Sequence, residues 1–354
     1  MRRIRRVSLV DVILWGIRIG VVIFVALGTF LTLSDGLLTG ENWRDLLIFG
    51  IAQGSVYALI ALGYTLVYGV LFMINFAHGD VFMFGAMTAF FTADALAAPD
   101  PTTGVSLLNA NPLFGMALVL ATAMLSAMLV AVVLERLAYR PLRRAPRLVP
   151  LITAIGASLF ISNSVRGLYG ERILGYPQLE ILRGTFDLFG IPVLKTQAVV
   201  IVGAALTMVL LYWFVERTRT GRAMRAISED KDTAALMGID VDRTITITFA
   251  VGGMLAGAAG VLYAIVFPQV HWFMGFLPGI KAFTAAVLGG IGNIIGAMLG
   301  GVSLGVLESV APNLLLLGFG VPSPNQLRDV VAFSVLVLVL IFRPYGLLGR
   351  PEGK

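Results

Sequence analysis

Seven long apolar runs dominate this 354-residue chain. A helix needs about 20 mostly apolar residues to cross the hydrocarbon core of a bilayer. The runs are Val12–Leu33, Leu46–Leu71, Val81–Ala98, Leu113–Leu134, Leu148–Val165, Thr196–Val215 and Thr244–Phe267. Only 13% of the residues are charged, about half the usual share in soluble domains. The sequence therefore predicts an all-α polytopic membrane protein, and it disfavours a soluble enzyme, a disordered chain and a fibrous repeat.

Two further segments are less regular. Ala282–Ala311 is long and rich in glycine, and Val330–Phe342 is short unless it includes Gln326–Asp329. The run LGGIGN at 288–293 indicates a break. We therefore expect Ala282–Ala311 to enter and leave the membrane as two half-helices, because irregular backbone at membrane depth is tolerated where protein buries it. This gives about eight transmembrane helices plus a re-entrant segment; the alternative is one long crossing.

Basic residues orient these spans, because cytoplasmic loops carry an excess of Lys and Arg. They gather at the N-terminus, after the fourth and sixth runs, and in the C-terminal tail. Alternation of the spans predicts a cytoplasmic N-terminus, and the re-entrant segment would leave the tail cytoplasmic as well. The first run resembles the core of a signal peptide, but it is long and contains Arg18, so we expect a retained helix.

Several kinds of chemistry have no sequence support. The chain has no cysteine, and its two histidines, His78 and His271, lie far apart. It also lacks the Gly-x4-Gly-Lys-Ser/Thr nucleotide loop and the HExxH motif. We expect no metal, no cofactor and no catalytic residue in this chain, so any ATP-driven action needs a partner. The basic residues flank apolar runs, which favours contact with membrane lipid over nucleic acid.

The segment 216–243 lies between the sixth and seventh runs and carries six basic and six acidic residues. Ser228 could cap a short helix with acidic residues at its positive end, and Gly238 supplies a stop signal. Such a helix could expose Ala234, Ala235 and Met237 as a docking surface for another protein. The alternative is an ordinary solvated loop of mixed charge, which composition alone favours.

The core of this segment, SEDKDTAALMG at 228–238, resembles the cytoplasmic coupling loop of ABC importer permeases. Other segments are similar to the branched-chain amino acid ABC permease family, specifically its H-type subunit. They are Gly54–Thr65 (GSVYALIALGYT), Ile74–Asp80 (INFAHGD), Gly279–Gly292 (GIKAFTAAVLGGIG) and the tail at 343–350 (RPYGLLGR). The resemblance runs from about Leu46 to Pro351. It divides the chain into an N-terminal part, 1–45, with a basic stretch and the first helix, and a permease domain, 46–354, with its coupling loop at 216–243.

The resemblance implies a function and a set of partners. It implies the permease subunit of an ATP-driven importer of branched-chain or other hydrophobic amino acids in a bacterial inner membrane. The pore would be completed by a second permease, either a related chain or a second copy, and two ATPase subunits would bind ATP and Mg²⁺. An extracytoplasmic amino-acid-binding protein would deliver the substrate. The ATPases would engage Ser228, Glu229, Asp230, Ala234, Ala235 and Gly238, and the pore would alternate between outward and inward access.

Ionisable groups within membrane spans are costly and mark candidate functional sites. Asn75, His78 and Asp80 follow the second run; they could line the translocation path or lock a broken helix, or they could cap helix ends at the cytoplasmic interface. Lys281 could attract a carboxylate or extend to the interface, and Glu308 could pair with it only if the chain folds back. These alternatives remain open in the sequence.

Two further groups complete the candidates for the path or for a helix break. Tyr57 and Tyr64 belong to a tyrosine stripe of the second run, which could line a pore or pack between helices. Gly289, Gly290 and Gly292 are candidate hinge or cavity residues, because glycine permits unusual backbone angles. By contrast, the glycines of the spacing small-xxx-small at 252–260 and 296–305 favour close helix packing.

Two other functions are weighed against this one. A permease for urea, short amides or other amino acids would share much of the pattern, because the binding protein commonly decides the substrate. A stand-alone secondary transporter would need no ATPase, and the acidic-Ala-Ala…Gly core of segment 216–243 argues against it.

Overall fold

The computed structural model describes residues 9–99, 104–143, 145–146, 148–188, 190–343 and 345–349. The α-helices are α1 (Leu9–Ser34), α2 (Gly40–Leu71), α3 (His78–Ala97), α4 (Leu107–Ala110), α5 (Pro112–Leu134), α6 (Leu148–Tyr169), α7 (Lys195–Arg217), α8 (Arg219–Glu229), α9 (Lys231–Leu236), α10 (Val241–Val266), α11 (Phe276–Gly289), α12 (Ile294–Leu316) and α13 (Arg328–Phe342). A π-helical turn, η1 (Glu135–Tyr139), extends α5, and short 3₁₀ turns are η2 (Arg140–Leu142), η3 (Glu180–Leu182), η4 (Leu317–Phe319) and η5 (Pro324–Leu327). The strands are β1 (Leu174–Gly175), β2 (Thr185–Leu188), β3 (Ile191–Leu194) and β4 (Gln269–Val270).

Nine helices of the described residues are long and apolar enough to cross a membrane. The seven runs identified in the sequence correspond to α1, α2, α3, α5, α6, α7 and α10, and the other two candidate spans are Ile294–Phe319 and Pro324–Phe342. The last one does include the residues before Val330. The prediction of an all-α polytopic membrane protein is confirmed.

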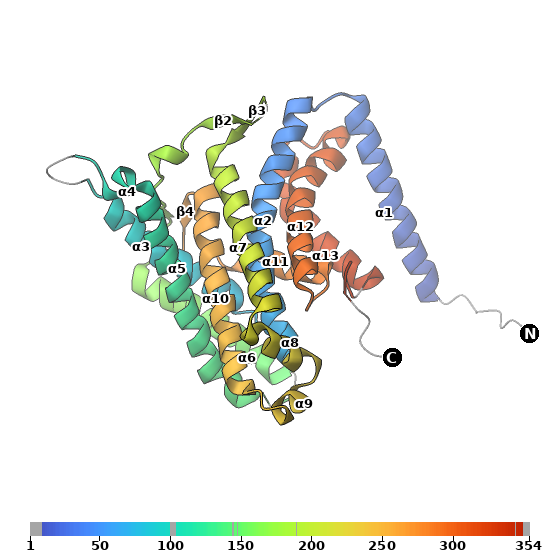
Figure 1. Cartoon of the computed structure of the whole chain (residues 1–354). Helices are drawn as coiled ribbons and strands as arrows, with labels where there is room; N and C mark the ends of the chain where they lie inside the picture. Colours follow the sequence, from blue (N-terminus) through green and yellow to red (C-terminus); the bar gives the residue numbers. More distant parts are fainter. Residues whose placement is uncertain are drawn as a thin grey trace, which may run out of the picture.

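Helix α2 lies at the centre of the bundle, where α10 and α12 pack against it (Figure 1). Glycines make the approach to α12 possible. A Cβ atom on Gly301 would lie 2.3 Å from the Cα of Ala58, and one on Gly305 would lie 2.3 Å from the Cα of Gly54. On the other side of the bundle, a Cβ on Gly257 of α10 would lie 2.3 Å from the carbonyl oxygen of Ala123. The predicted close packing at these glycine spacings is confirmed.

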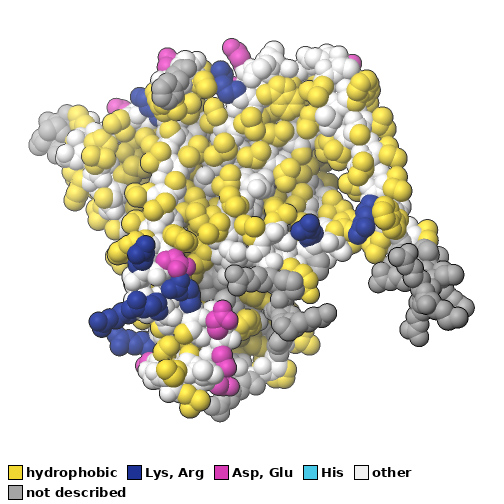
Figure 2. Space-filling model, turned by 45° about the vertical axis from the view of Figure 1, so that its right-hand side comes forward, with side chains coloured by type: hydrophobic (Ala, Val, Ile, Leu, Met, Phe, Trp, Pro, Cys, Tyr) yellow, Lys and Arg dark blue, Asp and Glu magenta, His cyan; other side chains and the backbone are white. Residues whose placement is uncertain are grey.

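Helix α1 stands apart from the rest of the bundle over much of its length (Figure 1). Its far end contacts the end of α12: Gly28 lies against Leu315, and Thr32 Oγ1 accepts a hydrogen bond from the backbone N–H of Gly318 at 2.9 Å. The rest of α1 exposes large apolar side chains such as Trp15, Ile19 and Val22. Figure 2 shows that hydrophobic side chains cover most of the visible face between the two ends of the bundle, as expected for a surface in contact with lipid or another membrane chain.

The two ends of the bundle differ. Helices α8 and α9 form one end, at the bottom of Figure 1, and the β2–β3 hairpin lies at the opposite end with the link between α1 and α2. Lys and Arg side chains gather at the α8–α9 end (Figure 2). We name these the α8–α9 end and the hairpin end.

The glycine break is found where the sequence places it, but the fold around it differs from the prediction. Helix α11 ends at Gly289, and α12 begins at Ile294 and is a candidate span of full length rather than a half-helix. The turn between them lies beside Ser228 and Glu229 of α8, at the α8–α9 end. Residues 282–311 are therefore neither an in-and-out pair of half-helices nor one long crossing.

The chain reaches α11 through an extended stretch after α10. Strand β4 pairs antiparallel with β1, so that Leu174 lies opposite Val270 and Gly175 lies opposite Gln269. Five residues later, the carbonyl oxygen of Gly275 lies 2.5 Å from the position of a Cβ on Gly79, near the start of α3. The extended stretch and α11 together run from the end of α10 to the α8–α9 end. The extended stretch and α11 add one return passage to the nine candidate spans. The described chain therefore starts, with α1, and finishes, at residues 345–349, at the same end of the bundle.

Candidate translocation path and coupling loop

Helix α8 is fixed against the end of α7 by a tight local fold. Thr218 caps α8, since its Oγ1 accepts a hydrogen bond from the backbone N–H of Gly221 at 3.0 Å. A Cβ on Gly221 would lie 2.2 Å from the carbonyl oxygen of Val215, so only glycine fits there. Arg225 forms an ion pair with Glu216, and Ile227 is fully buried. Helix α8 is therefore attached to a membrane span along its apolar face.

Helix α9 is capped by Asp230. Its Oδ1 accepts hydrogen bonds from the backbone N–H groups of Asp232 at 2.9 Å and Thr233 at 3.0 Å, and these bonds hold its pKa below the usual aspartate value. The prediction that Ser228 caps this helix is wrong, because α8 continues through Ser228 and the Ser228 hydroxyl donates to the carbonyl oxygen of Arg225. The expected acidic residues at the N-terminus of a short helix are present.

The tip after α9 is exposed and apolar. Leu236 is 87% exposed and Met237 is 79% exposed, and Ala235 is exposed beside them. Gly238 has φ +83°, a left-handed backbone angle that ends the helix. The prediction that Ala234 is exposed is wrong: Ala234 is 4% exposed and packs inward, and Leu236 takes its place on the surface. We name Ala235, Leu236 and Met237 the α9 tip.

A buried carboxylate secures the base of α10 to the end of α5. Glu135 is fully buried and pairs with Arg143, which also pairs with Asp242 of α10. Thr246 donates a hydrogen bond to Glu135 Oε2 at 2.9 Å, and Arg140 binds Asp242 at 2.5 Å. The sequence reasoning did not single out this cluster. The paired charges at the ends of two apolar runs were its only signal.

A cavity of about 450 Å³ separates α8 from the glycine turn. Ser228 and Glu229 line one side, and Gly292 and Asn293 line the other. Gly290 has φ +104° and Gly292 has φ +92°, and a Cβ on Gly289 would overlap the carbonyl oxygen of Gly296. The backbone N–H groups of Leu347 and Leu348 bind the carbonyl oxygens of Leu288 and Gly289 at 2.8 and 3.0 Å. The candidate hinge glycines thus lie beside the coupling segment and not beside the other residues predicted for the translocation path.

A second candidate cluster surrounds the start of α3. Asn75 Oδ1 accepts a hydrogen bond from the hydroxyl of Tyr139 at 2.6 Å. The His78 imidazole lies against Gly63 of α2, with its Nε2 buried and without a hydrogen-bond partner among the described residues, and its ring meets the Tyr64 ring edge-on with centroids 4.9 Å apart. Asp80 shares a cavity wall with Ser158, the eleventh residue of α6. None of the three side chains caps α3. The N-cap residue of α3 is Ala77, and no side chain makes a capping hydrogen bond there.

This placement corrects the expected location of the cluster. The sequence order placed Asn75, His78 and Asp80 near the cytoplasmic interface, whereas His78 and Asp80 lie beside the interior of α2 and the middle of α6. All three are buried. A cavity of about 380 Å³ adjoins the cluster, with Tyr64, Asp80 and Ser158 on its wall. Phe276 and Gly279 of α11 line it as well, so the cavity lies between the centre of the bundle and α6. We name it the central cavity.

Lys281 belongs to a third cluster. Its ammonium pairs with Glu308 of α12 and lies 2.6 Å from a carboxylate oxygen of Asp329 in α13. The ammonium also lies 5.8 Å from the centroid of the Tyr57 ring, and Tyr57 accepts a hydrogen bond from Gln53 at 2.5 Å. The pairing of Lys281 with Glu308 is confirmed, but Lys281 is 7% exposed and does not extend to the interface. The path candidates therefore divide among three places: the central cavity, this ion cluster and the glycine turn.

Known proteins resemble the chain over most of its length. Residues 46–340 match the family model described as branched-chain amino acid transport system / permease component. The high-affinity branched-chain amino acid transport system permease protein LivH of Escherichia coli K12 is 42% identical over 306 residues, covering 86% of this chain and 94% of that protein. The corresponding BraD protein of Pseudomonas aeruginosa is 43% identical over 314 residues, covering 88% and 97%.

A more distant relative is the probable branched-chain amino acid transport permease protein LivH of Methanocaldococcus jannaschii, 29% identical over 308 residues, covering 84% and 90%. The matched region, 46–340, begins within α2 and includes the central cavity, the α9 tip and the ion cluster. A multi-pass helical bundle, a family match over more than half of the chain and near-complete coverage of two relatives agree with one another. The chain belongs to the permease component family of branched-chain amino acid transport systems.

Proposed function

We propose that this chain is a transmembrane permease subunit of an ATP-driven importer that takes up branched-chain or other hydrophobic amino acids. The observation that carries the proposal is the α9 tip. Two large apolar side chains on a short capped helix are exposed at the end of the bundle where basic residues gather. Such side chains favour burial against a protein partner, because exposed clusters of large apolar residues commonly mark interaction sites.

The partner would be an ATPase, since this chain has no nucleotide-binding loop of its own. Two ATPase subunits would hold ATP and Mg²⁺ and would seat the α9 tip with Glu229, Asp230 and Gly238 around it. Helix α8 packs against α2, and α2 packs against α11 and α12, so a displacement of α8 would be passed on to α11 and α12 through α2. A second permease chain and an extracytoplasmic binding protein would complete the assembly.

The substrate assignment rests on the relatives, which are branched-chain amino acid permeases by name. The central cavity supports it, because its wall combines apolar side chains with a buried carboxyl and hydroxyl groups. An amphipathic substrate needs such a wall. Basic residues at the α8–α9 end favour a cytoplasmic location for that end, with the N-terminus on the same side of a bacterial inner membrane.

The test is a tagged purification of this chain in mild detergent from cells that express the complete system. With the natural α9 tip we expect recovery of a Walker-motif ATPase and of a second permease. Leu236→Asp together with Met237→Asp should abolish recovery of the ATPase and leave the second permease in place. Leu188→Asp is the matched control, because Leu188 is an exposed leucine of β2 at the hairpin end. Normal recovery of the ATPase with the double variant would contradict the proposal.

A further inference from the structure

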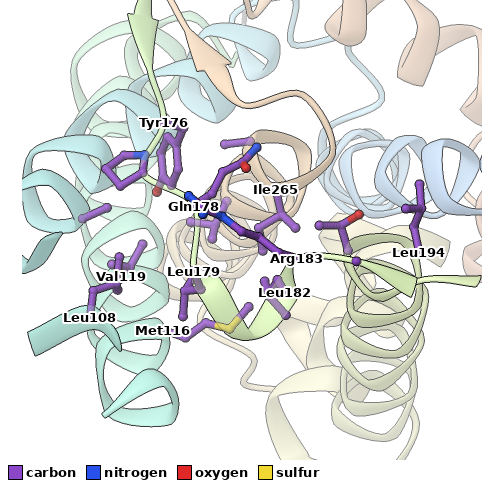
Figure 3. A pocket seen from close by; sticks show the side chains of 16 residues that line it. Leu108, Met116, Val119, Tyr176, Gln178, Leu179, Leu182, Arg183, Leu194 and Ile265 are labelled. Atoms are coloured by element: carbon purple, nitrogen blue, oxygen red, sulfur yellow. The ribbon is translucent and has the colours of Figure 1, made fainter. Parts of the chain in front are cut away.

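A pocket lies near the hairpin end, away from the central cavity and the coupling segment. Its volume is about 240 Å³, and α3, α5, α10 and the loop between α6 and α7 form its walls (Figure 3). Apolar side chains supply most of the lining, among them Leu108, Val119, Leu179 and Ile265. No residue lines both this pocket and the central cavity in the described part of the chain. We name it the loop pocket.

The roof of the loop pocket is fixed in place. The backbone N–H of Tyr176 donates to the carbonyl oxygen of Pro268 at 3.1 Å, next to the β1–β4 pair. The backbone N–H of Glu180 donates to Asn109 Oδ1 at 3.1 Å. The loop is thus joined to α10 and to the α4–α5 junction on either side of the pocket. A cavity held open by such bonds needs little ordering when a ligand binds.

One polar group inside the pocket has no partner. Tyr176 is only 8% exposed, and its buried hydroxyl makes no hydrogen bond within the described residues. Burial raises the pKa of this hydroxyl, so it stays protonated and can both donate and accept. A buried hydroxyl without a partner is unfavourable, and the pocket is where a partner can reach it. Figure 3 shows Tyr176 among the apolar side chains that surround the cavity.

The pocket also has a single positive charge. Arg183 is the only charged residue among the described residues that line it, and it forms no ion pair within the described part of the chain. Gln178 lies beside the same opening and adds an amide that donates and accepts. An apolar chamber with one guanidinium at its rim and a free hydroxyl inside is suited to a small molecule with a carboxylate at one end.

The volume limits the size of that molecule. At about 30 Å³ for each water, the pocket of about 240 Å³ has room for roughly eight water-sized groups. A short branched aliphatic acid has about that many non-hydrogen atoms, whereas a phospholipid acyl chain is much longer. We propose that the loop pocket binds a short branched aliphatic carboxylate, such as a free branched-chain amino acid, with its carboxylate on Arg183 and its side chain against the apolar wall. This site is separate from the central cavity and does not depend on ATPase docking.

The absence of cysteine in the sequence permits a direct test. Leu182 lines the pocket, so Leu182→Cys places the chain's one thiol there. The variant would be purified as the intact complex in lipid nanodiscs without ATP, and its reaction rate with a small maleimide would be measured. The probes are leucine, 4-methylpentanoate, which lacks the amino group, and leucinamide, which lacks the carboxylate. We expect leucine and 4-methylpentanoate to slow labelling several-fold at saturation and leucinamide to leave it unchanged.

Second variants separate the pocket from other sites. Adding Arg183→Gln to Leu182→Cys should raise the concentration needed for protection at least about tenfold, since a charge-assisted hydrogen bond is lost. Arg172→Gln is the matched control, because Arg172 is an exposed arginine of the same loop that does not line the pocket. In Leu188→Cys the thiol lies outside the pocket, and no probe should slow its labelling.

Three outcomes would overturn the proposal. The first is a labelling rate at Leu182→Cys that none of the probes changes, in a complex that native mass spectrometry shows to be intact. The second is equal protection by leucinamide and leucine, which would remove the role of the carboxylate. The third is a phospholipid retained by the natural complex and lost with Arg183→Gln, which would assign the pocket to lipid. Failure of the ATPase to co-purify would affect only the proposed coupling, since the labelling needs no ATP.

Discussion

The ammonium of Lys281 on α11 forms an ion pair with the carboxylate of Glu308 on α12, and Glu308 is 1% exposed. Asp329 of α13 approaches the same ammonium from a more exposed position. Two carboxylates thus share one cation at a point where three helices meet. This arrangement joins α13, which is otherwise mostly exposed, to the interior of the bundle. An ion cluster of this kind specifies the position of a helix more than it adds stability.

Removal of the shared cation should be severely destabilising. Lys281→Met leaves Glu308 buried without its cation, and breaking a buried pair costs about 3–5 kcal/mol. The double change Lys281→Met with Glu308→Leu should recover much of this loss, because it removes both buried charges. The measurement is thermal unfolding of the purified complex, with Lys195→Met as a control at a less buried lysine. Equal stability of the single variant and the natural chain would contradict the structure.

The contact between α2 and α12 should not accept a side chain at Gly305. Gly305→Ala would place a Cβ 2.3 Å from the Cα of Gly54, and overpacking of this kind typically costs about 1–3 kcal/mol. Gly156→Ala is the matched control: Gly156 lies within α6, and a Cβ there meets nothing within 4 Å. The melting temperature in detergent should fall for the first variant and stay constant or rise for the second. A fall of equal size in both would point to a general intolerance of alanine.

Helix α9 should lose order when Asp230 is replaced. Asp230→Ala removes the three hydrogen bonds that this carboxylate accepts, two from backbone N–H groups and one from the Thr233 hydroxyl, and should speed amide exchange at residues 231–237 several-fold. Asp230→Asn should preserve most of the protection. The pKa of Asp230 is lowered, chiefly by the hydrogen bond from the backbone of Thr233. Its stabilising effect is therefore complete above the usual aspartate pKa of about 3.9 and is lost as the pH falls through the lower, folded value. Asp230→Asn should abolish that acid-dependent loss in the same exchange experiment, and its persistence would rule out Asp230 as the cause.

The backbone angle at Gly292 should matter more than its surroundings. Gly292 and Gly69 both line the cavity beside α8, and a Cβ on either meets nothing within 4 Å. Gly292 has φ +92°, whereas Gly69 lies within α2. Gly292→Ala should therefore cost about 1–3 kcal/mol in strain, and Gly69→Ala should be neutral or slightly stabilising. Unfolding of the two variants is the measurement, and equal stability would show that the turn adapts to the side chain.

The membrane spans could be predicted because apolar composition over about 20 residues is a local property. The glycine packing faces followed from spacing alone, as Gly301 and Gly305 show. The cap of α9 was assigned to the wrong residue because Ser228 and Asp230 both suit that role. The choice depends on how far α8 extends, and contacts of Gly221 and Ile227 with the end of the bundle decide this.

The burial of Lys281 could not be read from its neighbours in sequence, since its partners come from two later helices. The depth of His78 and Asp80 was misjudged for a related reason. Helix α3 starts beside the interior of α2 instead of at the end of a crossing. The segment 288–293 was correctly predicted as a break. Its position along the bundle depends on the extended stretch before α11, which the hydrophobicity of the sequence does not reveal.

The loop between α6 and α7 holds the extended stretch before α11 in place. Strand β4 takes its ladder bonds from β1, and Pro268 receives a bond from Tyr176. Without them, carbonyl and amide groups close to the bundle interior would have to find water or other donors. An epitope inserted at the β2–β3 turn should be accepted with little effect, whereas one inserted at Gly175 would release the strand leading into α11. A tag at the β2–β3 turn would then label a working transporter, whereas a tag fourteen residues earlier, at Gly175, would disable it.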